Sequence, residues 1–243
     1  MGLPRRFLVT AGNTRERIDS VRDWGNIFTG NTGYAIAKAL AALGEVDLLT
    51  SNHAHLLEVK TLALPHAIHG SAFKSHDELR GALAALTGRT NYDAIFMTAA
   101  VSDYQPTRVY EVLSRQPGET QVGVEQWVVR DVQAGKVKSS HREIAVLGSP
   151  TEKLVDLFRS EWGFGGLLVK FKLEVGISPE ALLKIGEASR VASGADYLVA
   201  NSLDMVGGDG AGAFLLGAAG HEWVPRAQLA DRLATLAATG RRA

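Results

Sequence analysis

Residues 25–32 read GNIFTGNT, a stretch that could hold a phosphate group. The nucleotide-binding loop G-x-x-x-x-G-K-[ST] uses backbone N–H groups and its lysine, and here Asn31 stands in the place of that lysine. No credible strand is formed by the preceding residues, SVRDWGN, so we reject a true loop of this class. What remains is GNTG (30–33) at the start of a predicted helix, where unpaired N–H groups and the helix dipole favour an anion. The alternative is an ordinary helix N-cap at Asn31 or Thr32.

A second pattern with known chemistry is YxxxK, formed by Tyr34 and Lys38. This is the spacing of the catalytic pair in short-chain dehydrogenases. Here it falls on the first predicted helix, and no G-x-G-x-x-G follows the strand-like run FLVT (7–10). We therefore interpret the pair as a core-facing tyrosine and a solvated lysine, and an NAD(P)-dependent reductase stays as an alternative function.

Basic residues in GKVKSSHRE place Lys136 and Lys138 in a polar turn. An ammonium group on a mobile loop can close over a phosphate and neutralise developing charge, although a solvated basic loop is the ordinary alternative. Asp103, after a predicted strand, could bind a ribose hydroxyl or a metal ion, or cap a turn. His53 and His55 have no evident third ligand, so we assign no metal-ligating residues.

These residues must be positioned by an alternation of strands and helices. Strands are predicted at 7–10, 45–51, 59–64, 92–100, 166–175 and 196–201. Helices are predicted to begin near Thr32, at 75–86 with Ser75 and Glu78 as a capping box, at 149–158 with Ser149 as N-cap, at 181–193 and at 226–239. Such alternation requires crossover connections, which predicts a doubly wound, mostly parallel sheet with helices on both faces.

Three segments fall outside this alternation. Residues 15–29 have no clear period and are predicted to be a long loop. Residues 104–149 form an extended excursion, read as a hairpin followed by the basic turn, and GAFLLG and HEWVPR are predicted to pair as a C-terminal hairpin. We find no repeat and no linker, so residues 1–243 are expected to form one α/β domain, with no second domain beside it.

Composition excludes several classes of protein. The chain carries 26 Lys and Arg against 26 Asp and Glu, a balance that argues against nucleic-acid or membrane-surface partners. It has no cysteine, which excludes disulfides, thiolate metal centres and a cysteine nucleophile, and which is compatible with a cytoplasmic protein. The N-terminal apolar run is too short for a signal peptide, and no run of 18 apolar residues predicts a spanning helix.

Taken together, the motifs resemble the phosphopantothenoylcysteine synthetase (phosphopantothenate–cysteine ligase) family of coenzyme A biosynthesis. The matching segments occur in the family's order: VTAGNTR (9–15), NIFTGNTG (26–33), AAVSDY (99–104), KVKSS (136–140), KFKLE (170–174) and VAN (199–201). The resemblance implies a Rossmann-like ligase that joins 4′-phosphopantothenate to L-cysteine through an acyl nucleotidylate. It implies CTP or ATP as co-substrate, Mg²⁺, and a homodimer whose arm lies within 104–140, with residues 104–135 as the dimer arm and the lysine flap after it.

The resemblance also implies roles for individual residues. Asn26 matches the asparagine that engages the acyl intermediate, and Lys136 matches the flap lysine that stabilises the nucleotide and developing charge. The nucleotide is expected to be bound by Gly12, Thr98, Ala99, Asp103, Phe171 and Arg190. Phosphate and substrate groups are expected to be bound by Thr29, Gly30, Asn31, Thr32 and Gly33.

The chain departs from the family pattern at three positions where the family carries a basic residue. Asn31 replaces a lysine or arginine, which should weaken anion binding. Ser189 and Ser193 replace helix lysines ahead of VAN, which leaves Arg190 as the nearest cation. A relative that joins a different acid or amine, or a non-catalytic nucleotide-binding protein, would show the same changes.

Overall fold

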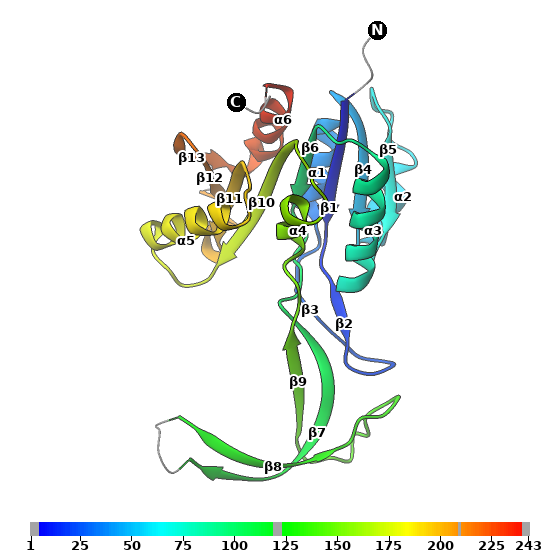
Figure 1. Cartoon of the computed structure of the whole chain (residues 1–243), viewed down its shortest axis with the longest axis vertical. Helices are drawn as coiled ribbons and strands as arrows, with labels where there is room; N and C mark the ends of the chain where they lie inside the picture. The colour runs from blue at the N-terminus through cyan, green and yellow to red at the C-terminus, as the bar shows by residue number, and fades with distance from the viewer. Residues whose placement is uncertain (1–4, 119–122, 209, 240–243) are drawn as a thin grey trace.

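The computed structural model describes residues 5–118, 123–208 and 210–239. An eight-stranded sheet lies at its centre, in the order β13-β12-β11-β10-β6-β1-β4-β5. Its six parallel strands are β1 (Arg5–Ala11), β4 (Gly44–Thr50), β5 (Ile68–Ala72), β6 (Ala94–Met97), β10 (Leu167–Glu174) and β11 (Tyr197–Ser202). This is the predicted mostly parallel α/β sheet, and Figure 1 shows helices on both of its faces.

Burial on both faces explains why the central strands read as unbroken apolar runs. Phe7 and Val9 of β1 belong to one core, and Leu8 points into a second core on the opposite face. The first core includes residues of α1 (Asn31–Leu40) and α6 (Leu229–Thr239); the second includes residues of α3 (His76–Arg89) and α4 (Leu154–Ser160). A third, smaller cluster joins α5 (Pro179–Ala192) to β11 and β12.

The strand order reverses between β1 and β6. β1 pairs with β4 on one side and with β6 on the other, so the crossovers on the two sides run in opposite directions. In open α/β sheets such a reversal opens a crevice at the carboxyl ends of the strands, where ligands bind. The predicted C-terminal hairpin is confirmed: β12 (Gly212–Gly217) and β13 (Gly220–Pro225) pair antiparallel at one edge.

A three-stranded arm projects from the carboxyl end of the main sheet, as Figure 1 shows. It consists of β7 (Tyr104–Pro117), β8 (Glu125–Asp131) and β9 (Ile144–Pro150), paired antiparallel in the order β8-β7-β9. The predicted excursion is therefore a β-structure of its own. Residues 119–122, which belong to that prediction, lie outside the described residues.

Three local predictions were wrong. Residues 59–64 do not form a strand, because Asn52 caps a helix, α2 (His53–Val59), and the next strand begins only at Ile68. Ser149 is not an N-cap, since it lies in β9 and α4 begins five residues later. The segment 15–29 is not entirely loop, because β2 (Arg15–Arg17) pairs with β3 (Asp23–Gly25).

The helix prediction at 75–86 was close to the structure. Ser75 is the N-cap of α3, and its side chain accepts from the backbone N–H of Glu78. The reciprocal bond differs from a standard capping box, since the Glu78 carboxylate accepts from the N–H of Lys74 instead of Ser75. In the described ranges no helix is long and apolar enough to cross a membrane.

Candidate active site

A cleft of about 570 Å³ lies at the carboxyl ends of the central strands, where the strand order reverses. The cleft brings together the turn after β1, the loop of residues 25–33 (the glycine loop), the turn after β6, the end of β10 and the start of α4. Eleven of the thirteen sequence-predicted site residues line it: Gly12, Asn26, Thr29, Gly30, Asn31, Thr32, Gly33, Thr98, Ala99, Asp103 and Phe171. Lys136 and Arg190 do not line it.

The glycine loop presents an uncapped helix start to this cleft. Gly30 is the N-cap of α1, with a left-handed φ of 81°, and no side chain caps the helix. The alternative of a cap at Asn31 or Thr32 is therefore wrong. The first N–H groups of a helix have no intrahelical acceptor and carry partial positive charge, so this end of α1 can bind an anion.

Close backbone packing explains why glycine stands at these positions. A Cβ on Gly30 would lie 2.1 Å from the backbone nitrogen of Gly12 and one on Gly33 2.2 Å from Oγ1 of Thr98. The glycine loop thus lies directly on the turns after β1 and β6. This contact places the start of α1 between the two strands at which the sheet reverses.

A buried histidine holds the side chain of Asn31. The Nε2 atom of His55 lies 3.1 Å from Oδ1 of Asn31, and the imidazole stacks on Tyr34 with ring centroids 4.3 Å apart. Asn52 contacts the same nitrogen at 3.2 Å and donates to the carbonyl of Thr29 at 3.0 Å. Burial lowers the pKa of His55, which favours the neutral ring at this place. The side chain at position 31 is thus a neutral carboxamide held in place by His55.

The YxxxK pair lies outside the cleft. Tyr34 is buried, and burial raises its pKa to about 12, which opposes proton transfer by its phenol near neutral pH. The ammonium of Lys38 sits 4.5 Å over the Tyr34 ring and 3.6 Å from Glu58. The pair therefore has the structural role that its helical spacing indicates.

Asn26 stands at the rim of the cleft beside the end of β6. The side-chain Nδ2 of Asn26 donates to the carbonyl of Ala100 at 3.2 Å, and the backbone carbonyl of Asn26 accepts from the side-chain amide of Asn13. Asn13 in turn forms a parallel bridge with Ala100, just after β6. The carboxamide of Asn26 is therefore fixed at the carboxyl edge of the sheet.

The turn after β6 is held by a buried hydroxyl. Oγ1 of Thr10 accepts from the N–H groups of both Thr98 and Ala99 at 3.0 Å. Farther along this turn Asp103 forms an ion pair with Lys153 of the segment before α4. The turn is thus a rigid wall of the cleft, with a paired charge at its outer end.

Arg190, for which the resemblance implies a nucleotide-binding role, does not line the cleft. Its guanidinium forms an ion pair with Glu187 at 2.6 Å and donates to the carbonyl of Ala195 at 3.1 Å, after the C-terminal end of α5. The cleft contains instead Lys170 and Lys172 of β10, which the sequence analysis left without a role. Their signal is visible in the sequence, since two alternate lysines interrupt an otherwise apolar strand.

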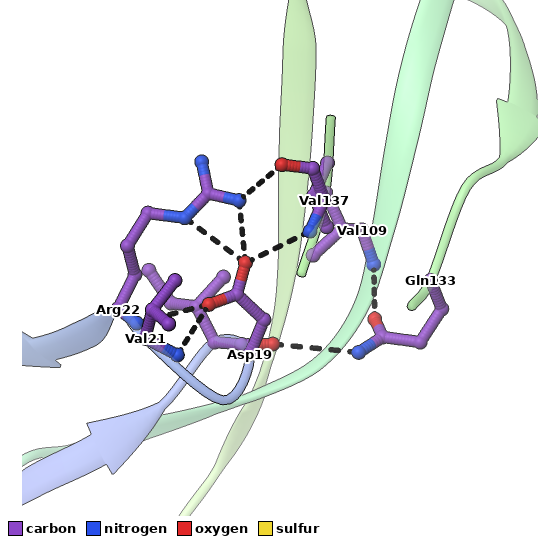
Figure 2. Close-up of polar contacts among 7 residues, drawn as sticks. Asp19, Val21, Arg22, Val109, Gln133 and Val137 are labelled. Atoms are coloured by element: carbon purple, nitrogen blue, oxygen red, sulfur yellow. Dashed lines mark hydrogen bonds and ion pairs between the residues drawn. The ribbon is translucent and has the colours of Figure 1, made fainter. Parts of the chain in front are cut away.

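Lys136 lies on a loop that packs against residues 18–22. Figure 2 shows Asp19, buried, accepting from Arg22 and from the backbone of Val21 and Val137. The Arg22 guanidinium and these backbone groups hold the pKa of the Asp19 carboxyl well below its usual range. The lysine loop is thus tied to the segment between β2 and β3.

A second contact fixes the same loop. Gln133 accepts from the N–H of Val109 at 2.9 Å and donates to the carbonyl of Ile18 at 3.4 Å (Figure 2). The N–H of Ser20 donates to the carbonyl of Gly135 at 2.8 Å. β7, the segment 18–20 and the lysine loop therefore form one hydrogen-bonded unit.

Comparison with known proteins adds to this geometry. Residues 3–126 match the family model described as the DNA/pantothenate metabolism flavoprotein C-terminal domain. The chain is 29% identical over 233 residues to the coenzyme A biosynthesis bifunctional protein CoaBC of Thermococcus kodakarensis, covering 94% of this chain. It spans only 50% of that relative's length.

Solved structures share the fold. The DNA/pantothenate metabolism flavoprotein of Streptococcus pneumoniae superposes with a TM-score of 0.73 at 24% identity, covering 94% of this chain and 96% of the other. A Cab2 mutant in complex with phosphopantothenate–cysteine superposes with a TM-score of 0.65 at 16% identity, covering 91% and 80%. At these identities the likeness concerns the fold.

Proposed function

The chain belongs to the family of the DNA/pantothenate metabolism flavoprotein C-terminal domain, and from this premise we propose that it is a nucleotide-dependent acid–amino acid ligase. The proposed substrates are 4′-phosphopantothenate, L-cysteine and CTP or ATP. The observation that carries the proposal is the uncapped start of α1 in the same cleft as Asn26. We further propose that residues 1–243 act as one ligase domain.

The reaction that this site would perform has two steps. A carboxylate oxygen of the acid attacks the α-phosphorus of the nucleotide, and the bond to the β-phosphate breaks with release of pyrophosphate. The amine of cysteine then attacks the acyl carbon and loses a proton, while the bridging oxygen leaves with the nucleoside monophosphate. Both steps depend mainly on the positioning of reactants and on stabilisation of negative charge.

Fixed dipoles of the cleft would stabilise that charge. The N–H groups at the start of α1 would bind phosphate oxygens, because they are unpaired and lie at the positive end of the helix dipole. The Asn26 carboxamide would donate to the acyl carbonyl, since its Nδ2 already donates to a carbonyl oxygen at the cleft. Donors of this kind need no reorganisation during the reaction.

Lys136 would serve the cleft of a second copy. It does not line the cleft of its own chain, and it is carried by the loop that joins β8 to β9 beside the middle of β7. The arm exposes the apolar side chains of Leu113, Trp127 and Val128, with exposed fractions of 52%, 44% and 56%. We propose that these side chains are covered in a homodimer, which brings the ammonium of one subunit toward its partner.

Magnesium would enter the site with the nucleotide. In the part of the chain that the structure describes, no group of three His, Asp or Glu side chains could hold a metal ion by itself. Mg²⁺ commonly binds through one or two carboxylates, water and substrate phosphates, and Asp156 lines the cleft without an ion pair within 4 Å among the described residues. When bound, the ion would neutralise phosphate charge, and Asp156 would hold it.

Pyrophosphate release tests the proposed function. Purified protein is incubated with Mg²⁺, 4′-phosphopantothenate and either CTP or ATP, with and without cysteine. We expect pyrophosphate with at least one nucleotide and continued turnover only when cysteine is present. The proposed substrate set fails if neither nucleotide yields pyrophosphate. If pyrophosphate is released only when another acid replaces 4′-phosphopantothenate or another amine replaces cysteine, the protein is a related ligase.

A further inference from the structure

Lys170 is a buried lysine on the wall of the cleft. It lies on β10, it is 9% exposed, and its ammonium donates to the carbonyl and the hydroxyl of Ser189 on α5 at 3.2 and 3.0 Å. The register of the parallel strands places it beside Met97 of β6 and Leu198 of β11. It therefore stands near the middle of the sheet, at the floor of the site.

The charge of Lys170 is not balanced within the described residues. Both of its acceptors, the carbonyl and the hydroxyl of Ser189, are neutral, although an ammonium has three N–H donors. The other lysines of the cleft wall are paired, Lys153 with Asp103 and Lys172 with Glu174 at 2.7 Å. No carboxylate lies within 4 Å of Lys170 in the portion of the chain described.

Burial of such a cation has a cost. Removing an ammonium from water without a counter-charge is unfavourable, and burial accordingly lowers the pKa of Lys170, opposed by the nearby Asp156 carboxylate. A buried strand position between Met97 and Leu198 would be filled more stably by an apolar side chain. The chain keeps a lysine there, with one N–H donor free of the two Ser189 acceptors, in the wall of the cleft that also contains the start of α1.

Ser189 makes this arrangement possible. Its short side chain leaves room for the long stem of Lys170 and supplies an acceptor. Ser189 is also one of the two places where the family pattern puts a lysine. The ammonium of Lys170, which a neighbouring strand carries, thus reaches α5 at the position of Ser189.

We propose that Lys170 is an anion-binding residue of the cleft, whose ammonium contacts the phosphate groups of a nucleoside triphosphate. The identity of that anion rests on the proposed function. A different role is available, because a cation near the last turn of α5 also interacts well with the helix dipole. A stabilising role of that kind and a binding role have different consequences for substitution.

Direct binding of anions distinguishes the two roles. Titration calorimetry with CTP, ATP and pyrophosphate, at fixed Mg²⁺ and without acid or cysteine, compares wild type with Lys170→Met. Methionine fills a similar volume without charge. We expect Lys170→Met to lower the affinity for at least one of the three anions by about tenfold or more, which is the contribution of a charge-assisted hydrogen bond. The control Lys184→Met, which removes an exposed lysine of α5 outside the cleft, should change the affinity less than about twofold.

Two further measurements complete the test. Without ligand, Lys170→Met should melt at the wild-type temperature or above it, because an unbalanced buried charge is removed. The double variant Lys170→Met with Ser189→Lys should recover most of the lost affinity, since it returns the ammonium from the helix side. If Lys170→Met binds all three anions as tightly as the wild type does, the inference is overturned. It is also overturned if Lys170→Met loses affinity and at the same time melts at a lower temperature than the wild type.

The inference and the proposed function can fail separately. If the wild-type protein releases no pyrophosphate but Lys170→Met still loses anion binding, the substrate assignment is wrong and the role of Lys170 stands. If pyrophosphate is released normally by wild type and by Lys170→Met alike, with equal KM for the nucleotide, the role of Lys170 is wrong and the function stands.

Discussion

The carboxylate of Asp19 accepts a hydrogen bond of 3.1 Å from the backbone N–H of Val137, the residue that follows Lys136. The same oxygen accepts from Arg22, whose guanidinium also donates to the carbonyl of Val137 at 2.8 Å. The glycine loop begins a few residues after this contact. The buried carboxylate of Asp19 therefore ties the lysine loop to the segment that precedes the glycine loop.

Replacing Asp19 by Asn should loosen the lysine loop. The variant keeps the size of the side chain but removes its charge, so the bonds to Arg22 and Val137 weaken. We expect a lower melting temperature at neutral pH and a fall in kcat of roughly tenfold with a smaller change in the nucleotide KM. Asp77→Asn, whose side chain is 88% exposed, is the control. An equal fall in kcat and in melting temperature in Asp19→Asn and Asp77→Asn would contradict this role of Asp19.

The stabilisation by Asp19 should depend on pH. Its pKa is lowered in the folded protein, chiefly by Arg22, so the carboxylate stabilises the fold at any pH above the ordinary value of about 4. This contribution is lost as the pH falls through the lowered pKa. The difference in melting temperature between wild type and Asp19→Asn should therefore be constant from pH 7 to about pH 5 and shrink in stronger acid. A difference in melting temperature that grows as the pH falls would refute this role of the Asp19 carboxylate.

Gly30→Ala should destroy the phosphate-binding loop. The new Cβ would meet the backbone of Gly12 at 2.1 Å, and alanine disfavours a φ of 81°. We expect the free energy of unfolding to fall by roughly 3 kcal/mol or more. Gly81→Ala is the matched control, because a Cβ there meets nothing within 4 Å inside α3, and it should be neutral or stabilising by up to about 1 kcal/mol. Denaturant unfolding of both variants measures the two free energies, and a Gly30→Ala variant as stable as Gly81→Ala would contradict the prediction.

Asn26→Asp should slow amide formation more than nucleotidylate formation. A carboxylate cannot donate to the acyl carbonyl and repels developing negative charge, so we expect a loss of roughly 100-fold in the second step. Quenched-flow measurement of pyrophosphate and of finished product separates the two steps. Asn91→Asp, an exposed change outside the cleft, should leave both rates unaltered. Equal slowing of the two steps by Asn26→Asp would contradict the assigned role.

Asn31→Lys should strengthen anion binding at the start of α1. The ammonium adds a charge-assisted contact worth about 1.5 kcal/mol, or about tenfold in the affinity for pyrophosphate. The gain should shrink as salt rises, because ions screen the new charge. Asn31→Met, which loses the contact with His55 without adding charge, should bind more weakly than wild type. A lysine variant no tighter than wild type would show that α1 does not face the anion.

Local sequence patterns predicted most strands of the sheet and the glycine turn at the start of α1, whereas the other expected residues of the cleft came from the family resemblance. The fully buried runs of β1 and β6 carry their own signal of burial on both faces. The glycines of the loop mark places where backbones meet. The strand predicted at 59–64 failed because Asn52 caps a helix just before it, and this single hydrogen bond decided the local structure.

The missed contacts of the cleft depend on segments far apart in the sequence. Arg190 was expected in the cleft because it is near VAN, but its side chain finds Glu187 one helical turn earlier. Lys170 was overlooked because its acceptor, Ser189, lies on the next helix. The spacing of these residues in the sequence does not determine which hydrogen-bond acceptor a long basic side chain contacts in the folded protein.

Transfer of oxygen from the acid to the nucleotide tests the central claim most directly. 4′-Phosphopantothenate labelled with heavy oxygen in its carboxylate is converted with cysteine, Mg²⁺ and CTP or ATP, and the products are analysed by mass spectrometry. The account requires one labelled oxygen in the nucleoside monophosphate and none in pyrophosphate, because the acyl nucleotidylate breaks at its acyl carbon. Label in inorganic phosphate, or product formed with no label in the monophosphate, would contradict it.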